Sequence, residues 1–454
     1  MHKVAKRALI LLALIGPLTV GLLLFVVRFA TNSGSWAVFE GSPHVYNGTN
    51  IGCGVVVDAD NLLLLNMLDG RTYSKSESLR KATIHWLGDR LGYISAPAVA
   101  EYAEEMAGFN LLNGVYGYGE NKGVAQLTLS ANVQNVALEA MGSYHGTVAV
   151  YNYKTGEILC AVTTPNYDPD NVPEIDENDY QYDGIYVNRF TQSVYIPGSI
   201  FKVVTLAAAL ETIPDITEQT FVCTGSYTIG VDEITCEGAH WEQDLESAFR
   251  NSCNCAFAQI ALQIGTDTME EYVARFGVTD SVRFDGITTQ SGNYESGGTD
   301  VRLAWSGIGQ YNDQVNPCAF LTYVGAVANG GEGVLPYLVK RVRVGNDITY
   351  QAETVTRERI MSEETALILK EFMRSNVVNK YGADNFGGLT VCAKTGTAEV
   401  GGDKKPNAML VGFSTDPEYP LAFVVCAEDA GYGSTVCIPI ASKVLEACKN
   451  HIGG

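Results

Sequence analysis

The sequence predicts an α+β fold, in which an antiparallel sheet packs between helices, placed behind one membrane-spanning helix and a small spacer domain. Three observations predict it. An uncharged apolar stretch occupies residues 8–27. From residue 123 onward, strand-like and helix-like patterns alternate and end in two β-rich runs and a helix. Hydrophobic residues make up 46% and charged residues 18% of the 454 positions, which is typical of a globular protein with a real core.

Residues 8–27 have the length of a membrane-spanning helix. At about 1.5 Å per residue they match the roughly 30 Å hydrocarbon core of a bilayer. Lys3, Lys6 and Arg7 precede the stretch, which favours a cytoplasmic N-terminus. No second run of this length follows, so we expect a single-pass protein whose remaining residues lie outside the cell. A cleaved signal peptide is the alternative, because small residues follow the stretch.

The charge and the cysteine content limit which ligands and cross-links the chain is expected to have. The net charge is −21 and no basic patch with interleaved aromatic residues occurs, so we expect no nucleic-acid partner. No Cys or His cluster has the spacing of metal ligands, so we expect no metal and no cofactor. Cys223 and Cys236 enclose a polar, hairpin-like insert on the extracellular side, which leaves open a local disulfide between them.

The chain divides into three predicted parts. Residues 1–30 form a cytoplasmic stub and the anchor, residues 31–122 a small spacer domain with a short strand-like run and helices, and residues 123–454 the main domain. The Gly-rich "NGVYGYGENKG" at 113–123 is the predicted linker between the last two. Its G-x-G is not a nucleotide-binding fingerprint, since no strand precedes it and no amphipathic helix opens at it.

The first elements of the main domain follow from periodicity. A strand leads into an amphipathic helix, whose apolar residues fall at i, i+3, i+4, i+7 and i+8: Val133, Val136, Ala137, Ala140 and Met141. Two β-rich runs then form a hairpin whose connecting turn contains Lys154, Thr155 and Gly156. The acidic residues 166–186 are expected to be a solvated loop, because their carboxylates lack the spacing of a calcium loop.

Ser199 and Lys202 form the first candidate catalytic pair. Ser199 is predicted to open the apolar helix "FKVVTLAAALE", and Lys202 follows three residues later, so both stand on one helical face. A serine hydroxyl needs a neighbouring base to become a nucleophile, and a buried lysine with a lowered pKa can be that base. The alternative is that Ser199 is a helix cap and Lys202 a surface residue.

Two later motifs complete a known signature in the required order. Ser252-Cys253-Asn254 follows the serine helix, and a second Lys-Thr-Gly, at Lys394, Thr395 and Gly396, follows in a β-like stretch with Thr397 next. S-x-x-K, S-x-N and K-T-G are the signature of serine acyl-transferring enzymes that react with penicillin. The earlier Lys-Thr-Gly precedes the serine, and so the later copy is the predicted active one.

The chain from about 123 to 450 resembles class B penicillin-binding proteins, which are membrane-anchored peptidoglycan D,D-transpeptidases of the bacterial cell membrane. The resemblance extends to "GTVAVYNYKTGEILCAVTTPNYDP", "NRFTQSVYIPGSIFKVVT" and "AVANGGEGVLPYLV". It implies a penicillin-binding fold, stem peptides and β-lactams as ligands, and a polytopic polymerase of lipid-linked precursors and other cell-wall machinery as partners. The chain departs from the family pattern at Asn316-Pro317, at Met409 and in the acidic loop 166–186.

The resemblance also implies a role for each motif residue. Ser199 attacks the penultimate D-Ala carbonyl, Lys202 takes its proton and Ser252 relays a proton to the leaving D-Ala. Asn254 binds the donor peptide, and Lys394 attracts the terminal carboxylate. Thr395 or Thr397 hydrogen-bonds that carboxylate. Gly396 keeps the strand edge bare for the substrate, and the backbone N–H groups of Ser199 and Thr397 form an oxyanion hole.

Other classes share parts of this pattern. A D,D-carboxypeptidase or a β-lactamase would use water in place of the acceptor amine, but a soluble β-lactamase needs neither anchor nor spacer. A β-lactam sensor would carry a cytoplasmic output domain. A catalytically silent scaffold of a cell-wall complex would not require the three intact motifs.

Overall fold

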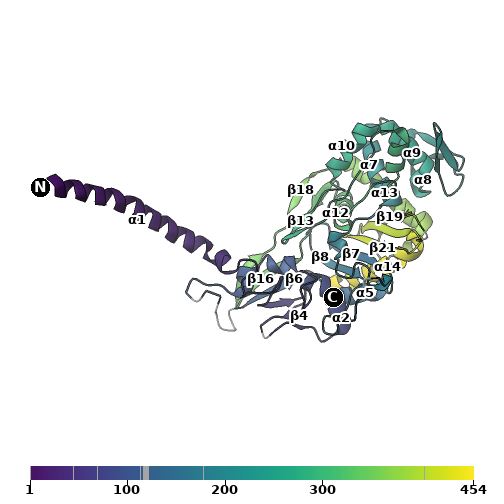
Figure 1. The fold of residues 1–454 in the computed structure, drawn as a ribbon. Coiled ribbons are helices and arrows are strands. Elements are labelled where there is room, and N and C mark those ends of the chain that lie inside the picture. The colour runs from purple at the N-terminus through teal and green to yellow at the C-terminus, as the bar shows by residue number, and fades with distance from the viewer. Residues whose placement is uncertain are drawn as a thin grey trace.

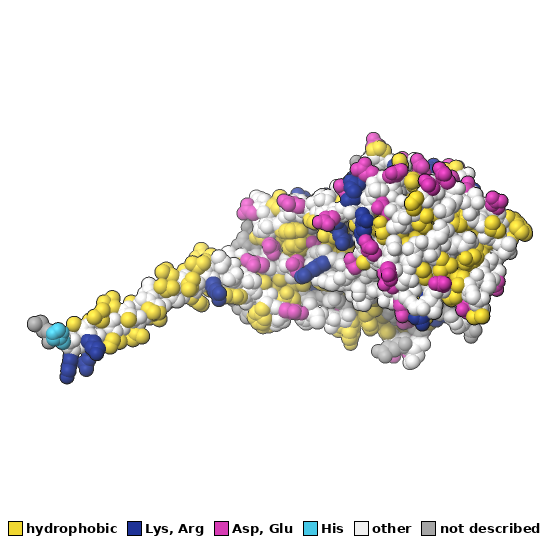
Figure 2. All heavy atoms as spheres, turned by 90° about the horizontal axis from the view of Figure 1, so that it is seen from above, with side chains coloured by type: hydrophobic (Ala, Val, Ile, Leu, Met, Phe, Trp, Pro, Cys, Tyr) yellow, Lys and Arg dark blue, Asp and Glu magenta, His cyan; other side chains and the backbone are white. Residues whose placement is uncertain are grey.

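The computed structural model describes residues 2–43, 45–68, 70–112, 114–115, 122–176, 178–402 and 404–453. The long helix α1 (His2–Ala37) projects from the body of the molecule (Figure 1). Within the described residues it is the one helix long and apolar enough to cross a membrane. Hydrophobic side chains cover its length, and Lys and Arg side chains gather at its N-terminal end (Figure 2). The helix continues beyond the predicted span to residue 37, where Ser33 and Gly34 become buried.

A six-stranded sheet lies next to this helix. Its order is β17 (Asp347–Gln351), β16 (Val339–Val344), β6 (Gly123–Leu127), β3 (Val55–Val57), β4 (Leu63–Asn66) and β5 (Thr72–Tyr73). The first two strands and β6 come from the predicted main domain and the others from the predicted spacer, joined by the parallel β3–β6 pair. The predicted boundary at 122/123 therefore falls within a shared sheet. Residues 113 and 116–121 of the predicted linker lie outside the described residues.

The remaining elements of the N-terminal part are short. They are the ribbon β1 (Tyr46–Asn47) and β2 (Asn50–Ile51), and the helices α2 (Glu77–Leu87), α3 (Pro97–Ala100) and α4 (Ala103–Ala107). Helix α2 begins at an N-cap, where the Ser76 side chain accepts a hydrogen bond from the Leu79 N–H, and it ends at Gly88.

The sheet that organises the site has five strands, all antiparallel. Its order is β19 (Val391–Ala398), β20 (Asn407–Ser414), β21 (Leu421–Ala427), β7 (Gly146–Asn152) and β8 (Ile158–Thr164). Helices α5 (Ala131–Met141) and α14 (Gly433–Gly453) pack on one face, and α12 (Pro317–Ala328) and α13 (Glu363–Asn376) on the other. Along β20, Met409 and Val411 join the core beside α12, while Ala408 and Leu410 join the core beside α14. The predicted antiparallel sheet between helices is confirmed.

A mainly helical region covers the β19 end of this sheet (Figure 1). It comprises α7 (Lys202–Thr212), α8 (Leu245–Arg250), α9 (Asn254–Ile264), α10 (Thr266–Phe276) and α11 (Asp300–Ser306), with the short α6 (Arg189–Gln192) nearby. Two ribbons complete it, β9 (Thr220–Cys223) with β12 (Trp241–Asp244) and β10 (Ser226–Ile229) with β11 (Asp232–Thr235). Two further ribbons are β13 (Arg283–Phe284) with β14 (Ile287–Thr288) and β15 (Glu332–Val334) with β18 (Thr356–Arg359).

The hairpin β10–β11 confirms the predicted insert between Cys223 and Cys236. The disulfide that the sequence left open is not formed, because all eleven cysteines are free. The earlier Lys-Thr-Gly is a turn, as predicted. It joins β7 to β8, and Gly156 has a φ of 92° there, a backbone conformation that favours glycine.

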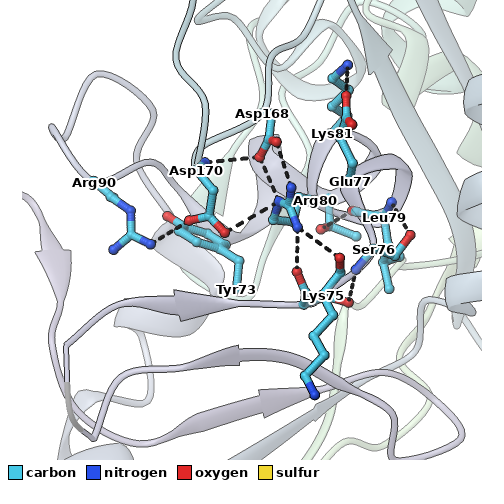
Figure 3. A network of polar contacts seen from close by, with 12 residues as sticks. Tyr73, Lys75, Ser76, Glu77, Leu79, Arg80, Lys81, Arg90, Asp168 and Asp170 are labelled. Carbon is cyan, nitrogen blue, oxygen red and sulfur yellow. Dashed lines mark hydrogen bonds and ion pairs between the residues drawn. The ribbon is translucent and has the colours of Figure 1, made fainter.

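The acidic loop after β8 is only partly solvated, which corrects the prediction for 166–186. Asp168 is buried, and its two carboxylate oxygens accept hydrogen bonds of 2.6 and 2.7 Å from Arg80 of α2 (Figure 3). Asp170 pairs with Arg90. The loop's first acidic residues therefore fasten it to the N-terminal part, and Glu177 within it lies outside the described residues.

Candidate functional site

Ser199 lies in a tight turn between β19 and α7. The turn is a 3₁₀ helix over Gly198–Ile200, and α7 begins only at Lys202, so Ser199 precedes the helix that it was predicted to open. The one-turn spacing nevertheless holds, because Ser199 Oγ lies 3.0 Å from Lys202 Nζ. Gly198 has a φ of 53° and its amide donates to the Gly309 carbonyl at 2.8 Å, which fixes the start of the turn.

Lys202 is fully buried and surrounded by oxygen atoms. Its amine lies 2.7 Å from the Ser252 carbonyl oxygen, 2.7 Å from Asn254 Oδ1 and 3.3 Å from Ser252 Oγ. The Phe257 ring stands 5.8 Å away. The Lys202 amine forms no ion pair with any carboxylate of the described residues. The amine is therefore desolvated but held by neutral acceptors.

These contacts suit a neutral Lys202 amine. The Ser252 carbonyl and the Asn254 amide oxygen can only accept hydrogen bonds, so each takes one N–H of the amine. A neutral amine has two N–H groups and one lone pair, and the lone pair then remains for the Ser199 hydroxyl proton. Burial acts in the same direction, lowering the pKa of Lys202 from 10.5 to about 8.

Lys394 approaches the same point from β19. Its fully buried amine donates to Ser252 Oγ at 3.0 Å and to the Thr395 carbonyl at 2.9 Å. Burial, and then the neighbouring Lys202, lower the pKa of Lys394. The Ser252 hydroxyl thus lies between two amines, within hydrogen-bond distance of both. The structure therefore brings together Ser199, Lys202, Ser252 and Lys394, the four predicted catalytic residues.

Ser252 and Asn254 are positioned by a strained turn. Ser252 has a φ of 55°, which is uncommon for a residue with a side chain, and such strained conformations cluster at functional sites. Asn254 is the first residue of α9. Its amide spans from Lys202 to the Thr235 carbonyl of β11, which accepts from Nδ2 at 2.9 Å. In this structure the predicted peptide-binding amide thus holds Lys202 and the hairpin β10–β11.

Strand β19 is an edge strand, and glycine lets the serine turn approach it closely. A Cβ on Gly396 would lie 2.9 Å from the Pro197 carbonyl oxygen, and one on Gly198 would lie 2.7 Å from the Thr397 carbonyl oxygen. Both glycines therefore bring the Ser199 turn against β19. This close approach explains why position 396 is a glycine, in addition to the predicted bare strand edge. It also places the Thr397 backbone beside Ser199.

The two threonines of β19 differ in their hydrogen bonds. Successive strand residues point to opposite faces, so Thr395 and Thr397 share one face and Lys394 and Gly396 the other. Thr395 Oγ1 lies 3.0 Å from the Tyr381 hydroxyl, which also accepts from the Thr395 amide at 3.2 Å. The Thr397 hydroxyl makes no hydrogen bond to any described residue and is half-buried.

Several supporting residues were missed from the sequence. The Asn376 amide donates to the Ala393 carbonyl at 3.0 Å, the Tyr381 hydroxyl contacts Thr395, and the Phe249 ring stands 5.8 Å from Lys394 Nζ. None belongs to a motif. The one available signal is the polar "SNVVNKY" at the end of an otherwise amphipathic helix, which places Asn376 and Tyr381 near each other.

Two departures from the family pattern have structural explanations. The Asn316 side chain caps α12, accepting from the Cys318 and Ala319 amides and donating to the Thr191 and Ser193 carbonyls. Met409 is buried on β20, opposite Gly396. Both residues therefore pack in the interior.

One group of side chains could hold a metal ion. The ligand atoms of Cys223, Cys236, His240 and Cys253 all lie within 4.8 Å of one another. The expectation of no metal rested on sequence spacing; the fold brings these four residues together from the end of β9, the connection between β11 and β12, and the start of α9. No other such group occurs in the part of the chain that the structure describes.

Comparison with known proteins agrees with this geometry. Residues 146–446 match the model of the penicillin binding protein transpeptidase domain. Over 360 residues the chain is 29% identical to the peptidoglycan D,D-transpeptidase PbpA of Mycobacterium tuberculosis, an alignment that covers 72% of each chain. It is 27% identical to stage V sporulation protein D of Bacillus subtilis, covering 72% of this chain and 54% of that protein.

Solved structures show the same fold. The crystal structure of PBPA from M. tuberculosis superposes with a TM-score of 0.76 at 23% identity, covering 87% of this chain and 99% of that one. The D,D-transpeptidase domain of a peptidoglycan glycosyltransferase from Eggerthella lenta gives a TM-score of 0.74 at 22% identity, covering 88% and 99%.

Proposed function

We propose that Ser199 is the nucleophile of this chain, which belongs to the penicillin-binding protein transpeptidase family. Like its mycobacterial relatives, the chain is a peptidoglycan D,D-transpeptidase. One observation supports this assignment above the others: the Ser199 hydroxyl lies 3.0 Å from a fully buried amine whose N–H groups face carbonyl oxygens. That arrangement supplies a base beside an otherwise unreactive hydroxyl.

The proposed acylation proceeds in two proton transfers. Ser199 Oγ attacks the carbonyl carbon of the penultimate D-Ala, and its proton passes to the Lys202 amine. The C–N bond to the terminal D-Ala then breaks, and Lys202 returns the proton through the Ser252 hydroxyl to the leaving amine. An acceptor amine then attacks the carbonyl carbon of the resulting ester, the bond from that carbon to Ser199 Oγ breaks, and the proton lost by the amine returns through Lys202 to Ser199, which forms the cross-link and regenerates the serine.

The remaining residues bind and orient the donor peptide in this proposal. The amides of Ser199 and Thr397 stabilise the developing oxyanion, for which one donor is typically worth about 3 kcal/mol. The Thr397 hydroxyl receives the terminal carboxylate, to which the buried Lys394 amine on the other face of β19 adds positive potential. Thr397 is preferred to Thr395 here, because the Thr395 hydroxyl already contacts Tyr381. Asn254 keeps Lys202 oriented and contacts the peptide.

Labelling with a fluorescent penicillin tests the assignment. The purified chain should form a covalent adduct on Ser199, and Ser199→Ala should form none while it keeps the wild-type melting temperature. An adduct that persists in Ser199→Ala contradicts the proposal. An adduct that hydrolyses within seconds would favour a hydrolase, because a transpeptidase excludes water and keeps the acyl group until an amine arrives.

The orientation in the membrane and the cell-wall partners are part of the same proposal. In this proposal the N-terminus lies in the cytoplasm and the body outside the bacterial cell membrane, an orientation that the basic residues before the apolar stretch of α1 favour. Helix α1 and the N-terminal part are then the surfaces that face a polytopic polymerase of lipid-linked precursors. Protease added to intact spheroplasts should degrade the body, and its survival there would contradict this orientation.

A further inference from the structure

Three cysteines and one histidine meet beside the catalytic turn. Cys223 ends β9, Cys236 follows β11, His240 precedes β12, and Cys253 lies between Ser252 and Asn254 at the start of α9. Cys236 Sγ lies 4.0 Å from Cys253 Sγ and 3.6 Å from His240 Nδ1. The backbone reinforces the arrangement, because the His240 amide donates to the Cys223 carbonyl at 3.0 Å.

These separations are those of a tetrahedral zinc site. With Zn–S bonds of about 2.3 Å and Zn–N bonds of about 2.0 Å, the edges of a tetrahedron are roughly 3.8 Å between two sulfurs and 3.5 Å between sulfur and nitrogen. The observed 4.0 and 3.6 Å agree with those edges. No pair of ligand atoms is farther apart than 4.8 Å, so small side-chain rotations would close the group around one ion.

Two of the three sulfurs already accept backbone hydrogen bonds, as thiolates require. The Asn254 amide donates to Cys236 Sγ and the Ala256 amide to Cys253 Sγ, each at 3.4 Å. Backbone N–H groups aimed at sulfur, here at the N-terminus of α9, stabilise negative charge on it. Cys223 Sγ faces the Gly238 carbonyl at 3.5 Å, a thiol contact that it would exchange for the metal.

The charge of such a site fits its surroundings. Three thiolates and a neutral imidazole around Zn²⁺ carry a net charge of about −1. Lys202 and Lys394 are buried nearby, and neither forms an ion pair with a carboxylate of the described residues. Lys202 bonds the two residues that flank Cys253 in the chain, Ser252 and Asn254. A metal centre with a net negative charge would thus include Cys253, whose two chain neighbours both contact the buried Lys202 amine.

We propose that Cys223, Cys236, His240 and Cys253 bind one zinc ion, which fastens the β10–β11 hairpin to the Ser252–Asn254 turn. Four protein ligands leave no open position for substrate, so the site is structural and not catalytic. A Cys₃His set is typical of zinc, since thiolates disfavour calcium and magnesium. The ion would keep Thr235 in place to bind the Asn254 amide, and through it the Lys202 amine.

Metal analysis of the purified full chain tests the proposal. Wild type, prepared with zinc and dialysed against metal-free buffer, should retain about one zinc per chain. Cys236→Ser and His240→Ala should lose it. Cys53→Ser and His451→Gln, which remove a cysteine and a histidine far from the group, should retain it. Cobalt substitution of wild type should give thiolate-to-metal charge-transfer absorption, a readout that does not depend on any variant folding.

Other results would overturn the proposal. A zinc-free wild type, or equal zinc in wild type and Cys236→Ser, would do so. So would an intact mass two hydrogens below that of the reduced chain with a Cys236–Cys253 disulfide, for which the sulfurs would have to approach to about 2.05 Å. The inference is separable from the proposed function, because Ser199→Ala should bind zinc like wild type while it loses penicillin labelling.

Discussion

Lys202 is the residue at which burial and hydrogen bonding decide the chemistry. A lysine exposed to water keeps its proton near neutral pH, but this amine is desolvated and meets two oxygens that can only accept. Lys394 lies beside it with a pKa also lowered by burial. Two ammonium ions sharing the Ser252 hydroxyl would repel each other, so the pair favours a state with at least one neutral amine.

The first prediction concerns the pH dependence of acylation. Since the free base of Lys202 takes the Ser199 proton, the rate should rise about tenfold per pH unit and level off above the lowered pKa of about 8. Stopped-flow acylation by a fluorescent penicillin measures it. Lys202→Arg should lose about 10²–10⁴-fold in rate, while Lys443→Ala should react like wild type. An inflexion at the ordinary lysine value of 10.5 would contradict the prediction.

The second prediction concerns Gly396. An alanine there would place its Cβ 2.9 Å from the Pro197 carbonyl and 3.0 Å from Ile200 Cγ2, so the Ser199 turn must shift away from β19. Small misplacements of reacting groups cost up to about 100-fold in rate, and we expect an acylation rate lowered about 10- to 100-fold. Gly333→Ala is the matched control, since its Cβ would meet nothing closer than 3.7 Å. Unchanged acylation in Gly396→Ala would show that the close approach is unimportant.

At the scale of elements, the loop after β8 illustrates how one buried pair fixes a segment. Arg80 of α2 binds both carboxylate oxygens of Asp168 and also the Ser74 and Lys75 carbonyls (Figure 3). The hydrogen bond from Arg80, more than any other contact, lowers the pKa of Asp168. The pair therefore couples the N-terminal part to the loop that follows the central sheet.

The third prediction concerns this pair. Arg80→Ala should reduce the free energy of unfolding by about 3 kcal/mol, because it leaves a buried carboxylate without its partner. Lys81→Ala, which removes the exposed pair with Glu77 on the same helix, should cost no more than about 0.5 kcal/mol. Urea denaturation of both variants measures the difference, and equal effects would contradict the prediction.

The same pair predicts the direction of a pH effect on stability. The folded-state pKa of Asp168 is lowered below its ordinary 3.8, so its contribution is complete above that value and is lost as the pH falls through the lowered pKa. The stability difference between wild type and Arg80→Ala should accordingly shrink in strong acid. A difference that grows as the pH falls would contradict this sign.

At the scale of the whole molecule, the six-stranded sheet joins the two predicted extracellular domains. Strand β3 pairs with β6, and β16 pairs with the other side of β6, so the main domain shares its first strand with the N-terminal part. Without residues 31–122, β6 would have an exposed edge, and buried apolar residues such as Ala125 and Leu127 would lose their cover.

The fourth prediction tests that dependence. A fragment of residues 123–454 should be insoluble or markedly less stable than one of residues 31–454, which keeps the sheet intact. Both lack the anchor, so the comparison isolates the N-terminal part. Thermal unfolding and penicillin labelling of the two fragments are the measurements, and a 123–454 fragment with unchanged melting temperature would make the spacer an independent domain.

The sequence by itself determined the long apolar N-terminal helix, the antiparallel sheet between helices and the order of the three motifs. These follow from local periodicity and from residue spacing within one turn, as for Ser199 and Lys202. Only the tertiary structure decided the rest. It joins β3 to β6, buries Asp168 against Arg80, seats Tyr381 on Thr395 and gathers Cys223, Cys236, His240 and Cys253 beside Ser252. These contacts join segments that are far apart in the chain or lie on separate elements. The periodicity within one segment therefore does not predict which other segment packs against it.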